Sequence, residues 1–504
     1  MKREAGILMP ISALDSPYGI GSFSKEAYAF ADFLASASQS VWQILPLCPT
    51  GYGDSPYQSP CSFAGNPYFI DPDALAEMGL ISKEDCRSYS ADSNSGRVDY
   101  GLLYERRYSL LRIAYESFIR GGESEDYRRF LVKNSFWLED YALFFAIKDH
   151  LAGAPLSSWE DSLRRRLPSA LAQYREKLSY EIGFVKFMQY EFFSQWQSLR
   201  DYANQKGISI MGDLPIYVSA DSSDLWVDPK LFLLDDELRP LFVAGCPPDD
   251  FSPSGQLWGN PIYDWQAHGA ENFAWWRRRL FAALHMYDRV RIDHFRGFEA
   301  FYSVPYGAPD ATDGHWERGP GEALFSQLMK DISPETIIAE DLGYITEEVR
   351  ELARHFGFAG MKILQFAFDG DTERYTSEYL PHNYERNTVA YTGTHDNMTL
   401  SEWLSSLDGA AEEKLRDYIL DRHTPKTELT QKLISVAMES VSRLCIIPMQ
   451  DYLGLGAEGR MNLPASASGN WSWRMPSGAL TDELCENIRR HAVRSGRGKS
   501  SDSI

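Results

Sequence analysis

Cysteines are few in this chain, and long apolar runs are missing. The six cysteines are scattered over 504 residues, without a C-x-x-C pair or an H-x-x-x-H pair. This spacing excludes a disulfide framework and a zinc-binding motif, and it predicts reduced thiols in a cytoplasmic protein. No stretch approaches the roughly 18 apolar residues of a membrane helix. The opening segment 1–14 has basic residues before an apolar run, but Pro10 interrupts it, so we predict a β-strand rather than a signal peptide.

Basic residues are also in the minority. The chain has 50 Lys and Arg against 71 Asp and Glu, which gives a net charge of −21. Nucleic acids and anionic membranes bind basic surfaces, so both are excluded as partners. Aromatic residues, in contrast, make up 13% of the chain, more than core packing usually requires. Most of these rings will lie in the core, and the others are suited to stacking against the C–H faces of sugars.

Short apolar runs alternate with helical patterns through most of the sequence. Strand-like runs begin near residues 6, 41, 208, 289, 336, 360, 387 and 443. From residue 289 onward most of them are separated by segments with helical periodicity, which is typical of parallel βα units. Eight such units predict an α/β fold of the (β/α)₈ TIM-barrel type. A doubly wound open sheet is the alternative that the pattern leaves open.

Two long segments interrupt this alternation. Residues 50–200, between the second and third strands, are mainly helical in pattern, and residues 216–285, between the third and fourth, are rich in Pro, Gly, Asp and Trp. We predict that both are large insertions on the C-terminal face of a single barrel domain spanning residues 1–504. The polar residues 495–504 are predicted to form a flexible tail.

Four acidic residues lie at the ends of predicted strands. They are Asp213, Asp293, Glu340 and Asp396, the last preceded by His395. In a (β/α)₈ barrel the C-terminal strand ends and their loops form one rim, where catalytic groups lie. One acid at a strand end is weak evidence, because many such residues cap the following helix. Four acids on one rim are much harder to explain as caps, so we predict an active site there.

The segment RVRIDHFRGF, residues 289–298, places Arg291 two residues before Asp293. Residues two apart in a strand share a face, so the guanidinium would favour the charged form of Asp293. A retaining glycosidase requires two carboxyls about 5 Å apart. At that separation they repel by about 3 kcal/mol at an effective dielectric constant near 20. We therefore expect Asp293 to be ionised and Glu340 to hold a proton, although a structural ion pair would equally suit this stretch taken alone.

The segments GDLPIYV, RIDHFRGF, IAEDLG and GTHDN occur in this order. They resemble the four conserved blocks of the amylomaltases, the 4-α-glucanotransferases of glycoside hydrolase family 77 in the α-amylase clan. The resemblance extends to GYGDSPYQSPCSFAGNPYFID, PPDDFSPSGQLWGNPIYDW and LGLGAEGRMNLPASASGNWSWR, and so covers almost the whole chain. One departure is PASASGNW, where the family more often has Pro-Gly-Thr before Gly-Asn-Trp. This departure affects a turn and not the chemistry.

The resemblance implies transfer of an α-1,4-glucan segment to the 4-hydroxyl of an acceptor glucan or glucose, by a retaining double displacement with a covalent glycosyl-Asp293 intermediate. α-1,4-Glucans, malto-oligosaccharides and glucose would be the partners. The implied catalytic residues are Asp293 as nucleophile, Glu340 as acid/base and Asp396 as the third carboxylate. The implied substrate-binding residues are Tyr57, Asp213, Arg291, His395, Gln256, Trp258, Phe366 and Asp369.

The resemblance also implies how these residues act. Tyr57 would stack on the sugar ring, and Asp213, Arg291 and His395 would bind or orient the same ring. Gln256 and Trp258 would belong to a mobile loop that covers the glucan, and Phe366 and Asp369 would flank the acceptor side.

Several of these side chains also have a structural interpretation. Tyr57 and Phe366 would be core rings by default. His294 and His395 would be candidate metal ligands, but no ligand spacing supports a metal site, so a hydrogen-bonded His294 is favoured. We expect neither a metal nor a cofactor. Asp341 would face the helix layer or cap the next helix, and we do not assign it to the site.

Two other functions use the same barrel rim. Plain α-glucan hydrolysis would need the same carboxylates, with water in place of a sugar hydroxyl as the acceptor. A catalytically silent glycan-binding protein would need no nucleophile and acid/base together, so Asp293, Glu340 and Asp396 argue against it. A barrel isomerase or lyase usually requires a metal or phosphate site, and the sequence has no motif for either.

Overall fold

The computed structural model describes residues 3–51, 53–90, 96–248, 252–368, 376–464, 466 and 468–498. Eight parallel strands form one sheet in the order β10-β11-β12-β1-β2-β3-β6-β9. All eight predicted strands are present. Their bounds are β1 Glu4–Leu8, β2 Val41–Gln43, β3 Ser209–Leu214, β6 Arg289–Ile292, β9 Ile337–Ala339, β10 Gly360–Ile363, β11 Thr388–Tyr391 and β12 Leu444–Pro448.

The two end strands of this sheet, β9 and β10, meet and close it into a barrel. Ile338 pairs with Ala359 in a parallel bridge, and the Ala339 N–H donates to the Ala359 carbonyl over 2.8 Å. The predicted (β/α)₈ barrel is therefore confirmed. The open-sheet alternative is wrong, because an open sheet would leave these two edges apart.

Alternating side chains on the strands build two apolar layers. On β11, Val389 and Tyr391 point into the barrel interior, whereas Ala390 between them belongs to the layer under the helices. The same alternation on β1 places Leu8 inside and Ile7 outside. This is the period-two pattern of a strand that is covered on both faces.

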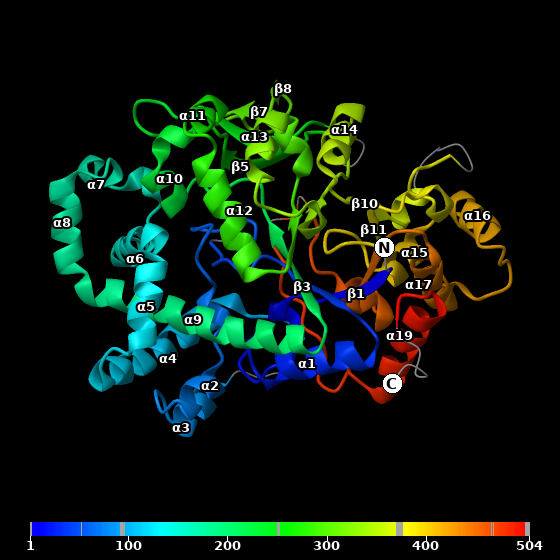
Figure 1. Ribbon diagram of the computed structural model, residues 1–504, viewed down its shortest axis with the longest axis horizontal. Coiled ribbons are helices and arrows are strands. Elements are labelled where there is room, and N and C mark those ends of the chain that lie inside the picture. The colour runs from blue at the N-terminus through cyan, green and yellow to red at the C-terminus, as the bar shows by residue number, and fades with distance from the viewer. Residues whose placement is uncertain are drawn as a thin grey trace.

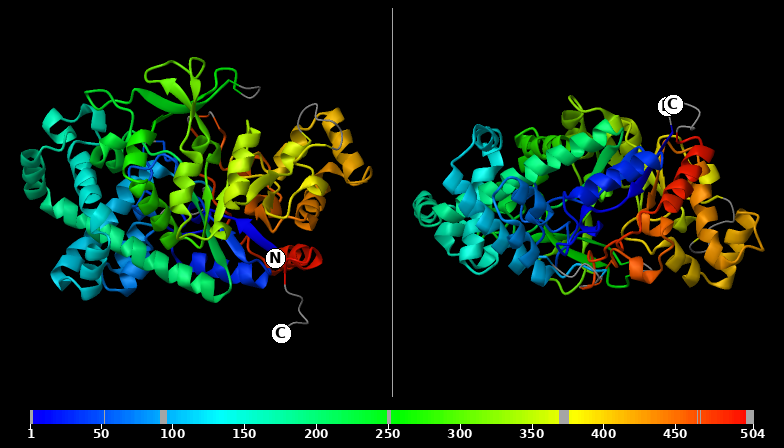
Figure 2. Two further views of the ribbon diagram at one scale, coloured as in Figure 1. Left: turned by 45° about the horizontal axis from the view of Figure 1, so that its top comes forward. Right: turned by 90° about the horizontal axis from the view of Figure 1, so that it is seen from below.

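Helices fill the segment between β2 and β3, where the sequence predicts a mainly helical insertion. The longest of them, α9, packs against α1 and β3, so it belongs to the ring of helices around the barrel. Figures 1 and 2 show the other helices of this segment, in blue and cyan, on one side of the barrel. α1, Lys25–Ser36, lies between β1 and β2, and the helices of the segment are α2 Pro72–Glu77, α3 Lys83–Ser88, α4 Tyr100–Gly121, α5 Glu125–Lys133, α6 Ser135–His150, α7 Asp161–Arg164, α8 Pro168–Lys177 and α9 Ser179–Gln205.

A second, antiparallel sheet has the order β5-β4-β7-β8. It joins β4 Phe242–Cys246 and β5 Gln256–Pro261, from the segment predicted to be loop-rich, to β7 Ala300–Pro305 and β8 His315–Arg318, which follow β6. The sequence analysis did not predict these four strands. They are short and lie among Gly and Pro, so their period-two signal is weak, and pairing with a distant segment decides their structure.

The remaining helices lie between and after the later strands. α12 packs against β3 and β6 and so continues the outer ring, whereas α15 to α17 fill the stretch between β11 and β12. The bounds are α10 Ser223–Val227, α11 Trp265–Ala270, α12 Ala274–Met286, α13 Gly321–Leu328, α14 Glu347–Phe356, α15 Leu400–Ser406, α16 Gly409–Tyr418, α17 Leu429–Glu439, α18 Met449–Tyr452 and α19 Asp482–Arg494.

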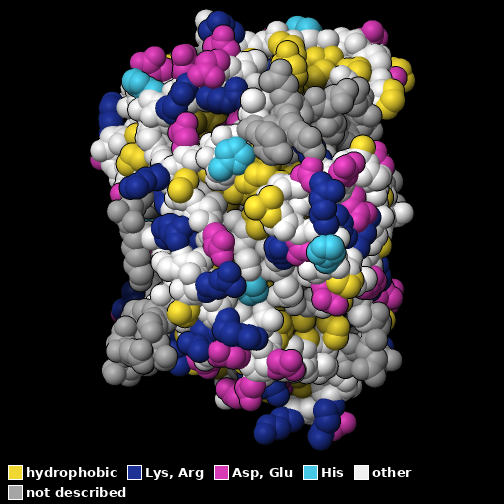
Figure 3. Space-filling model, turned by 90° about the vertical axis from the view of Figure 1, so that its right-hand side faces the viewer, with side chains coloured by type: hydrophobic (Ala, Val, Ile, Leu, Met, Phe, Trp, Pro, Cys, Tyr) yellow, Lys and Arg dark blue, Asp and Glu magenta, His cyan; other side chains and the backbone are white. Residues whose placement is uncertain are grey.

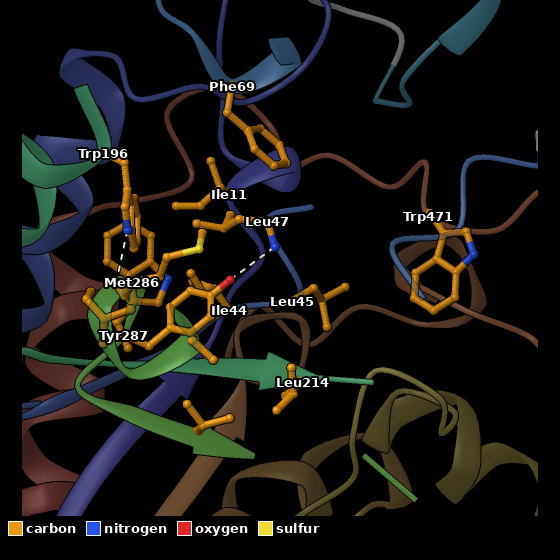
Figure 4. Close-up of a cluster of buried hydrophobic side chains, with 14 of the residues drawn as sticks. Ile11, Ile44, Leu45, Leu47, Phe69, Trp196, Leu214, Met286, Tyr287 and Trp471 are labelled. Atoms are coloured by element: carbon orange, nitrogen blue, oxygen red, sulfur yellow. Dashed lines mark hydrogen bonds between the residues drawn. The ribbon is translucent and has the colours of Figure 1, made fainter. Parts of the chain in front are cut away.

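Buried side chains of the outer layer lock α9 to the barrel (Figure 4). Trp196 of α9 donates from its indole N–H to the Met286 carbonyl at 3.0 Å. The adjacent Tyr287 lies before β6, and its hydroxyl accepts the Leu47 N–H at 3.2 Å. These polar groups are satisfied inside an apolar cluster, which fixes the start of β6 against the loop after β2.

The predicted flexible tail starts too early. Arg497 is only 2% exposed and donates to the carbonyls of Met438, Glu4 and Ser440. These contacts tie residues 495–498 to the base of the barrel, so the prediction is wrong for them, and residues 499–504 lie outside the described part of the chain.

The surface carries charges of both signs. On the face shown in Figure 3, Lys and Arg are interspersed with Asp and Glu. No described helix is long and apolar enough to cross a membrane.

Candidate active site

The C-terminal ends of four barrel strands open into one large cleft of about 1620 Å³. Asp293 and Glu340 directly follow β6 and β9, whereas Asp396 lies in the loop beyond Tyr391, where β11 ends. A cleft of this size exceeds the roughly 300–1,000 Å³ of a typical small-molecule pocket. The residues of interest that line it are Tyr57, Gln256, Trp258, Arg291, Asp293, His294, Glu340, Asp396 and Asn462.

Arg291 lies in the lining of this cleft and is only 3% exposed. One of its nitrogens, Nη1, donates to Asp213 Oδ2 at 2.6 Å, and Nη2 lies 3.1 Å from Asp293 Oδ1. The second distance confirms that Arg291 and Asp293 share a face of the strand. The first shows that a fully buried Asp213 side chain shares the guanidinium charge, which the spacing within one strand did not reveal.

Tyr57 connects Asp213 to the loop after β11. Its hydroxyl donates to Asp213 Oδ2 at 2.8 Å and lies 2.8 Å from His395 Nε2. Because the phenol has a single proton, it accepts from His395, which places a proton on Nε2. The two rings are nearly parallel, with centroids 5.4 Å apart. Residues far apart in the sequence thus form one hydrogen-bonded wall of the cleft.

Asp396 is held by two side chains. His395 Nε2 lies 3.2 Å from Asp396 Oδ2, and the Asn462 amide donates to Asp396 Oδ1 at 2.6 Å. Burial by itself would raise the pKa of Asp396, but His395, Asn462 and the charge of Arg291 outweigh it and hold the pKa below the usual range of a carboxyl. Asp396 is therefore an ionised hydrogen-bond acceptor at neutral pH.

The other two carboxyls have raised pKa values. Burial raises the pKa of Asp293 to about 6, against the opposing effect of Arg291. Burial also raises the pKa of Glu340 well above its ordinary value, and the charge of Asp293 adds to this effect. At neutral pH, Asp293 is therefore mostly ionised, and the protonated form of Glu340 is favoured. Burial is the largest cause of both shifts, and Arg291, which the sequence placed beside Asp293, opposes the rise at both carboxyls.

The backbone of His294 orients Glu340. His294 has a left-handed φ of 49°, and its N–H donates to Glu340 Oε2 at 2.6 Å. Its ring lies edge-on to Trp258, with centroids 4.8 Å apart, and its Nε2 is buried without a partner. The favoured interpretation of a hydrogen-bonded His294 side chain is wrong at Nε2, because ring packing takes the place of that bond. Burial lowers the pKa of His294 to about 4, so the ring is neutral.

Arg296 forms a second link between the loops after β6 and β9. Its Nη1 donates to the Tyr344 carbonyl, and its guanidinium lies 3.7 Å from the centre of the Trp316 ring. The sequence analysis missed Arg296 and Asn462. Arg296 stands in RIDHFRGF and Asn462 in the Gly-rich segment near residue 460, so both lie in segments that carry the resemblance.

Gln256 and Trp258 lie in strand β5, whereas the sequence analysis expected a mobile loop. The Trp258 indole N–H donates to Gln256 Oε1 at 3.1 Å, and Gln58 donates to the Trp258 carbonyl at 3.2 Å. Pairing of β5 with β4 holds this segment as part of a sheet.

Two further residues, Phe366 and Asp341, have contacts of other kinds, and a third, Asp369, is not described. Phe366 packs beside the barrel-interior cluster, and its ring centre is 5.4 Å from that of Tyr379. Asp369 lies outside the described residues. Asp341 caps no described helix, because its Oδ1 accepts the N–H of Met361 at 2.6 Å, in the neighbouring strand β10. Its Oδ2 lies on the Gly360 side of β10, opposite the interior residues Met361 and Ile363, so the helix-layer side stays the prediction for Asp341.

The described part of the chain contains no group of three or more His, Cys, Asp and Glu side chains that could hold a metal ion. The cleft is acidic, and the pKa of Asp396 is lowered whereas those of Asp293 and Glu340 are raised.

Comparison with known proteins agrees with this chemistry. A family model described as 4-alpha-glucanotransferase matches residues 9–481. The chain belongs to the 4-alpha-glucanotransferase family. A 4-alpha-glucanotransferase from Clostridium butyricum is 47% identical over 96% of this chain and 98% of its own length, and one from Thermus thermophilus is 44% identical over 98% of both.

The solved structures agree with the family assignment. The amylomaltase from Streptococcus agalactiae in complex with acarbose has a TM-score of 0.95 at 42% identity, and the match covers 99% of this chain and 100% of that one. Amylomaltase from Corynebacterium glutamicum, at 19% identity and a TM-score of 0.79, shares the fold. The chain is therefore an enzyme with 4-alpha-glucanotransferase activity.

Proposed function

We propose that this enzyme transfers α-1,4-glucan segments by a retaining double displacement on Asp293. The observation that carries the proposal is the arrangement of the three carboxyls, which line one cleft and have pKa values shifted in different directions. An ionised carboxylate beside a protonated one is what nucleophilic attack with acid assistance requires.

In the first step, Asp293 attacks the anomeric carbon of the donor glucan and the glycosidic bond breaks. Glu340 gives its proton to the departing oxygen. Its Oε2 already accepts the His294 N–H, so the proton belongs on Oε1, the oxygen that would face the substrate. Arg291 stabilises Asp293 as a carboxylate before attack and remains paired with Asp213 once the ester forms.

In the second step, Glu340 acts as the base. It removes the proton of an acceptor 4-hydroxyl, which attacks the glycosyl ester and releases Asp293. Each displacement inverts the anomeric carbon, so the product keeps the α-configuration. No proton is lost overall, because Glu340 gives one in the first step and regains one in the second.

The remaining polar groups would hold the donor sugar. Asp396 is an ionised acceptor suited to sugar hydroxyls, and Tyr57 offers a ring face beside it. Hydrogen bonds from hydroxyls to a charged acceptor are stronger than neutral ones, and they strengthen further as positive charge develops on the sugar. Phe366 and Asp369 remain predictions for the acceptor side, and cytoplasmic location remains a prediction from cysteine usage.

The proposal favours transfer over hydrolysis because Trp258 and Gln256, which line the cleft, would cover a bound glucan beside Glu340. Water is present at about 55 M, whereas a well-oriented acceptor reaches effective molarities of about 10⁵ M or more. An acceptor sugar docked under this cover would therefore compete successfully with water.

Product analysis with maltotriose alone tests the proposal. We expect glucose together with maltopentaose and longer oligosaccharides, all α-1,4-linked, while total reducing ends barely rise. Because acarbose is bound in the Streptococcus relative, we also expect it to inhibit this reaction competitively. Glucose and maltose as the only products, with reducing ends rising in step, would show that the enzyme is a hydrolase.

A further inference from the structure

The barrel seam between β9 and β10 is the weakest strand pairing in the described barrel. Every other pair of neighbouring barrel strands shares three or more residue pairs in register. At the seam, one bridge joins Ile338 to Ala359, with the Ala339 N–H donating to the Ala359 carbonyl. The seam lies immediately before Glu340, so the local structure of the seam determines the backbone position of the proposed acid/base.

Where the seam lacks main-chain hydrogen bonds, a side chain provides one. Asp341 Oδ1 accepts the Met361 N–H at 2.6 Å, so a carboxylate occupies the place of a main-chain carbonyl. A charged acceptor makes this bond stronger than an ordinary ladder bond. Asp341 therefore ties the first residues of the β9 loop to β10.

Gly360 makes room for this carboxylate. A Cβ atom at Gly360 would lie 2.4 Å from Asp341 Oδ2, a distance shorter than real Cβ contacts allow. The φ of Gly360 is not in the left-handed region, so space and not backbone conformation is the reason for a glycine. The pair Gly360 and Asp341 is thus a fitted contact across the seam.

Glu340 lies between two supports. On the β6 side, its own N–H donates to the Ile292 carbonyl at 3.1 Å, and its Oε2 accepts the His294 N–H. On the β10 side, the adjacent Asp341 holds the chain through Met361. We propose that Asp341 is a positioning residue for the acid/base, because its carboxylate closes the barrel seam and fixes the backbone that carries Glu340. This inference rests on the proposed role of Glu340.

The charge of Asp341 has a separate effect. Burial is the main reason for the raised pKa of Glu340, and the negative charge of Asp341 raises it further. Burial raises the pKa of Asp341 itself to about 6, with Lys362 opposing and Glu378 adding to the rise. Above about pH 7, Asp341 is therefore ionised and favours the protonated form of Glu340.

Three variants separate position from charge. Asp341→Asn keeps an acceptor for the Met361 N–H and removes the charge. Asp341→Ala removes both. Gly360→Ala keeps the charge and displaces the carboxylate.

Matched controls lie at the N-terminus of α16, away from the cleft: Asp408 is its N-cap residue and Gly409 its first residue. Asp408→Ala removes a carboxylate that accepts the Ala411 N–H at 2.8 Å. Gly409→Ala adds a Cβ that meets nothing within 4 Å. For each variant, kcat and KM are measured with two substrates: maltotriose, and α-maltotriosyl fluoride with glucose as acceptor. The fluoride ion leaves without acid assistance, so the second substrate does not need Glu340 as an acid in the first step. The Tm of each variant is also measured.

We expect Asp341→Ala and Gly360→Ala to lose roughly a hundredfold in kcat with maltotriose, the usual cost of misplacing a catalytic group by about 1 Å. Their first-step rate with the fluoride should fall much less. Asp341→Asn should stay within roughly tenfold of wild type, because the hydrogen bond survives in neutral form. In Asp341→Asn and Asp341→Ala the basic limb of the pH–rate profile should move to lower pH, and in Gly360→Ala it should not.

Two results would overturn the inference. One is a kcat for Asp341→Ala within threefold of the Asp408→Ala control. The other is an equal loss on both substrates together with a large fall in Tm, which would mean that the fold and not Glu340 is affected. The first-step rate of Glu340→Gln with the fluoride substrate is measured in parallel. If the fluoride does not restore this rate, the proposed role of Glu340 as the acid is wrong. If the fluoride restores the rate of Glu340→Gln but not that of Asp341→Ala, only the inference about Asp341 is wrong.

Discussion

Arg291 is the residue on which the electrostatics of the cleft depend. It is buried and contacts both Asp213 and Asp293, so its charge offsets two carboxylates that would otherwise repel each other. A buried charge is tolerated only when it is paired and hydrogen-bonded, and here both conditions are met. The consequence is an Asp293 that stays ionised at neutral pH although burial raises its pKa to about 6.

Asp293→Asn should abolish transfer without unfolding the protein. The amide is nearly the same size but is a poor nucleophile, so we expect a loss of at least roughly a thousandfold in kcat/KM. The rate of glucose release from maltotriose measures this loss, with Asp408→Asn as a control for the loss of a carboxylate elsewhere. An Asp293→Asn enzyme with more than a tenth of wild-type activity would contradict the assigned role.

The dependence of kcat/KM on pH should report the two carboxyls. Asp293 must be ionised, so the rate should fall about tenfold per unit as the pH drops below its pKa of about 6. Glu340 must be protonated, so the rate should also fall as the pH rises through its raised pKa. With α-maltotriosyl fluoride the acid limb should remain and the basic limb should disappear, since fluoride departs without a proton. A basic limb of the same height with both substrates would argue against Glu340 as the acid.

At the scale of elements, strand β5 lines the cleft with Gln256 and Trp258. Trp258 lines the cleft and packs edge-on against His294, whereas its neighbour Leu257 is 42% exposed. Residues adjacent in a strand face opposite ways, so this pair separates the two faces of β5.

Trp258→Ala should raise the share of hydrolysis in the total reaction several-fold, because water would reach the glycosyl intermediate more easily. Leu257→Ala, on the other face, should leave that share as in the wild type. The ratio of new reducing ends to glucose released from maltotriose measures it. Equal ratios in the two variants would show that Trp258 does not exclude water.

At the scale of the whole molecule, buried carboxyls make stability depend on pH. Glu191 in α9 is 3% exposed, and burial raises its pKa from 4.5 to about 7. The folded state therefore prefers protonated Glu191. This contribution is fully present below pH 4.5 and is lost as the pH rises through about 7.

Glu191→Gln should accordingly raise the Tm at pH 8.5 and change it little at pH 5. The amide is neutral at every pH, so it removes a cost on the order of 3 kcal/mol at the higher pH. Glu176→Gln, on the exposed face of α8, is the matched control. A stabilisation of Glu191→Gln that is the same at both pH values would show that charge burial is not its cause.

The sequence by itself determined the eight strands, the presence of the acids on one rim and the shared face of Arg291 and Asp293. Each of these follows from local periodicity or from the spacing of two residues along one strand. In a barrel, the order of the strands also fixes where the residues at their C-terminal ends lie on the rim. The resemblance to known conserved blocks added the roles of the residues.

Only the tertiary structure decided which groups touch. Tyr57 meets Asp213 and His395, and Asn462 meets Asp396, across separations that no local pattern encodes. The second sheet likewise exists because β4 and β7, from different segments, pair with each other. Proton occupancy at Asp293 and Glu340 depends mainly on burial, and the role of Asp341 depends on a seam that exists only once the barrel has closed. These are properties of distance in space, which the chain acquires by folding.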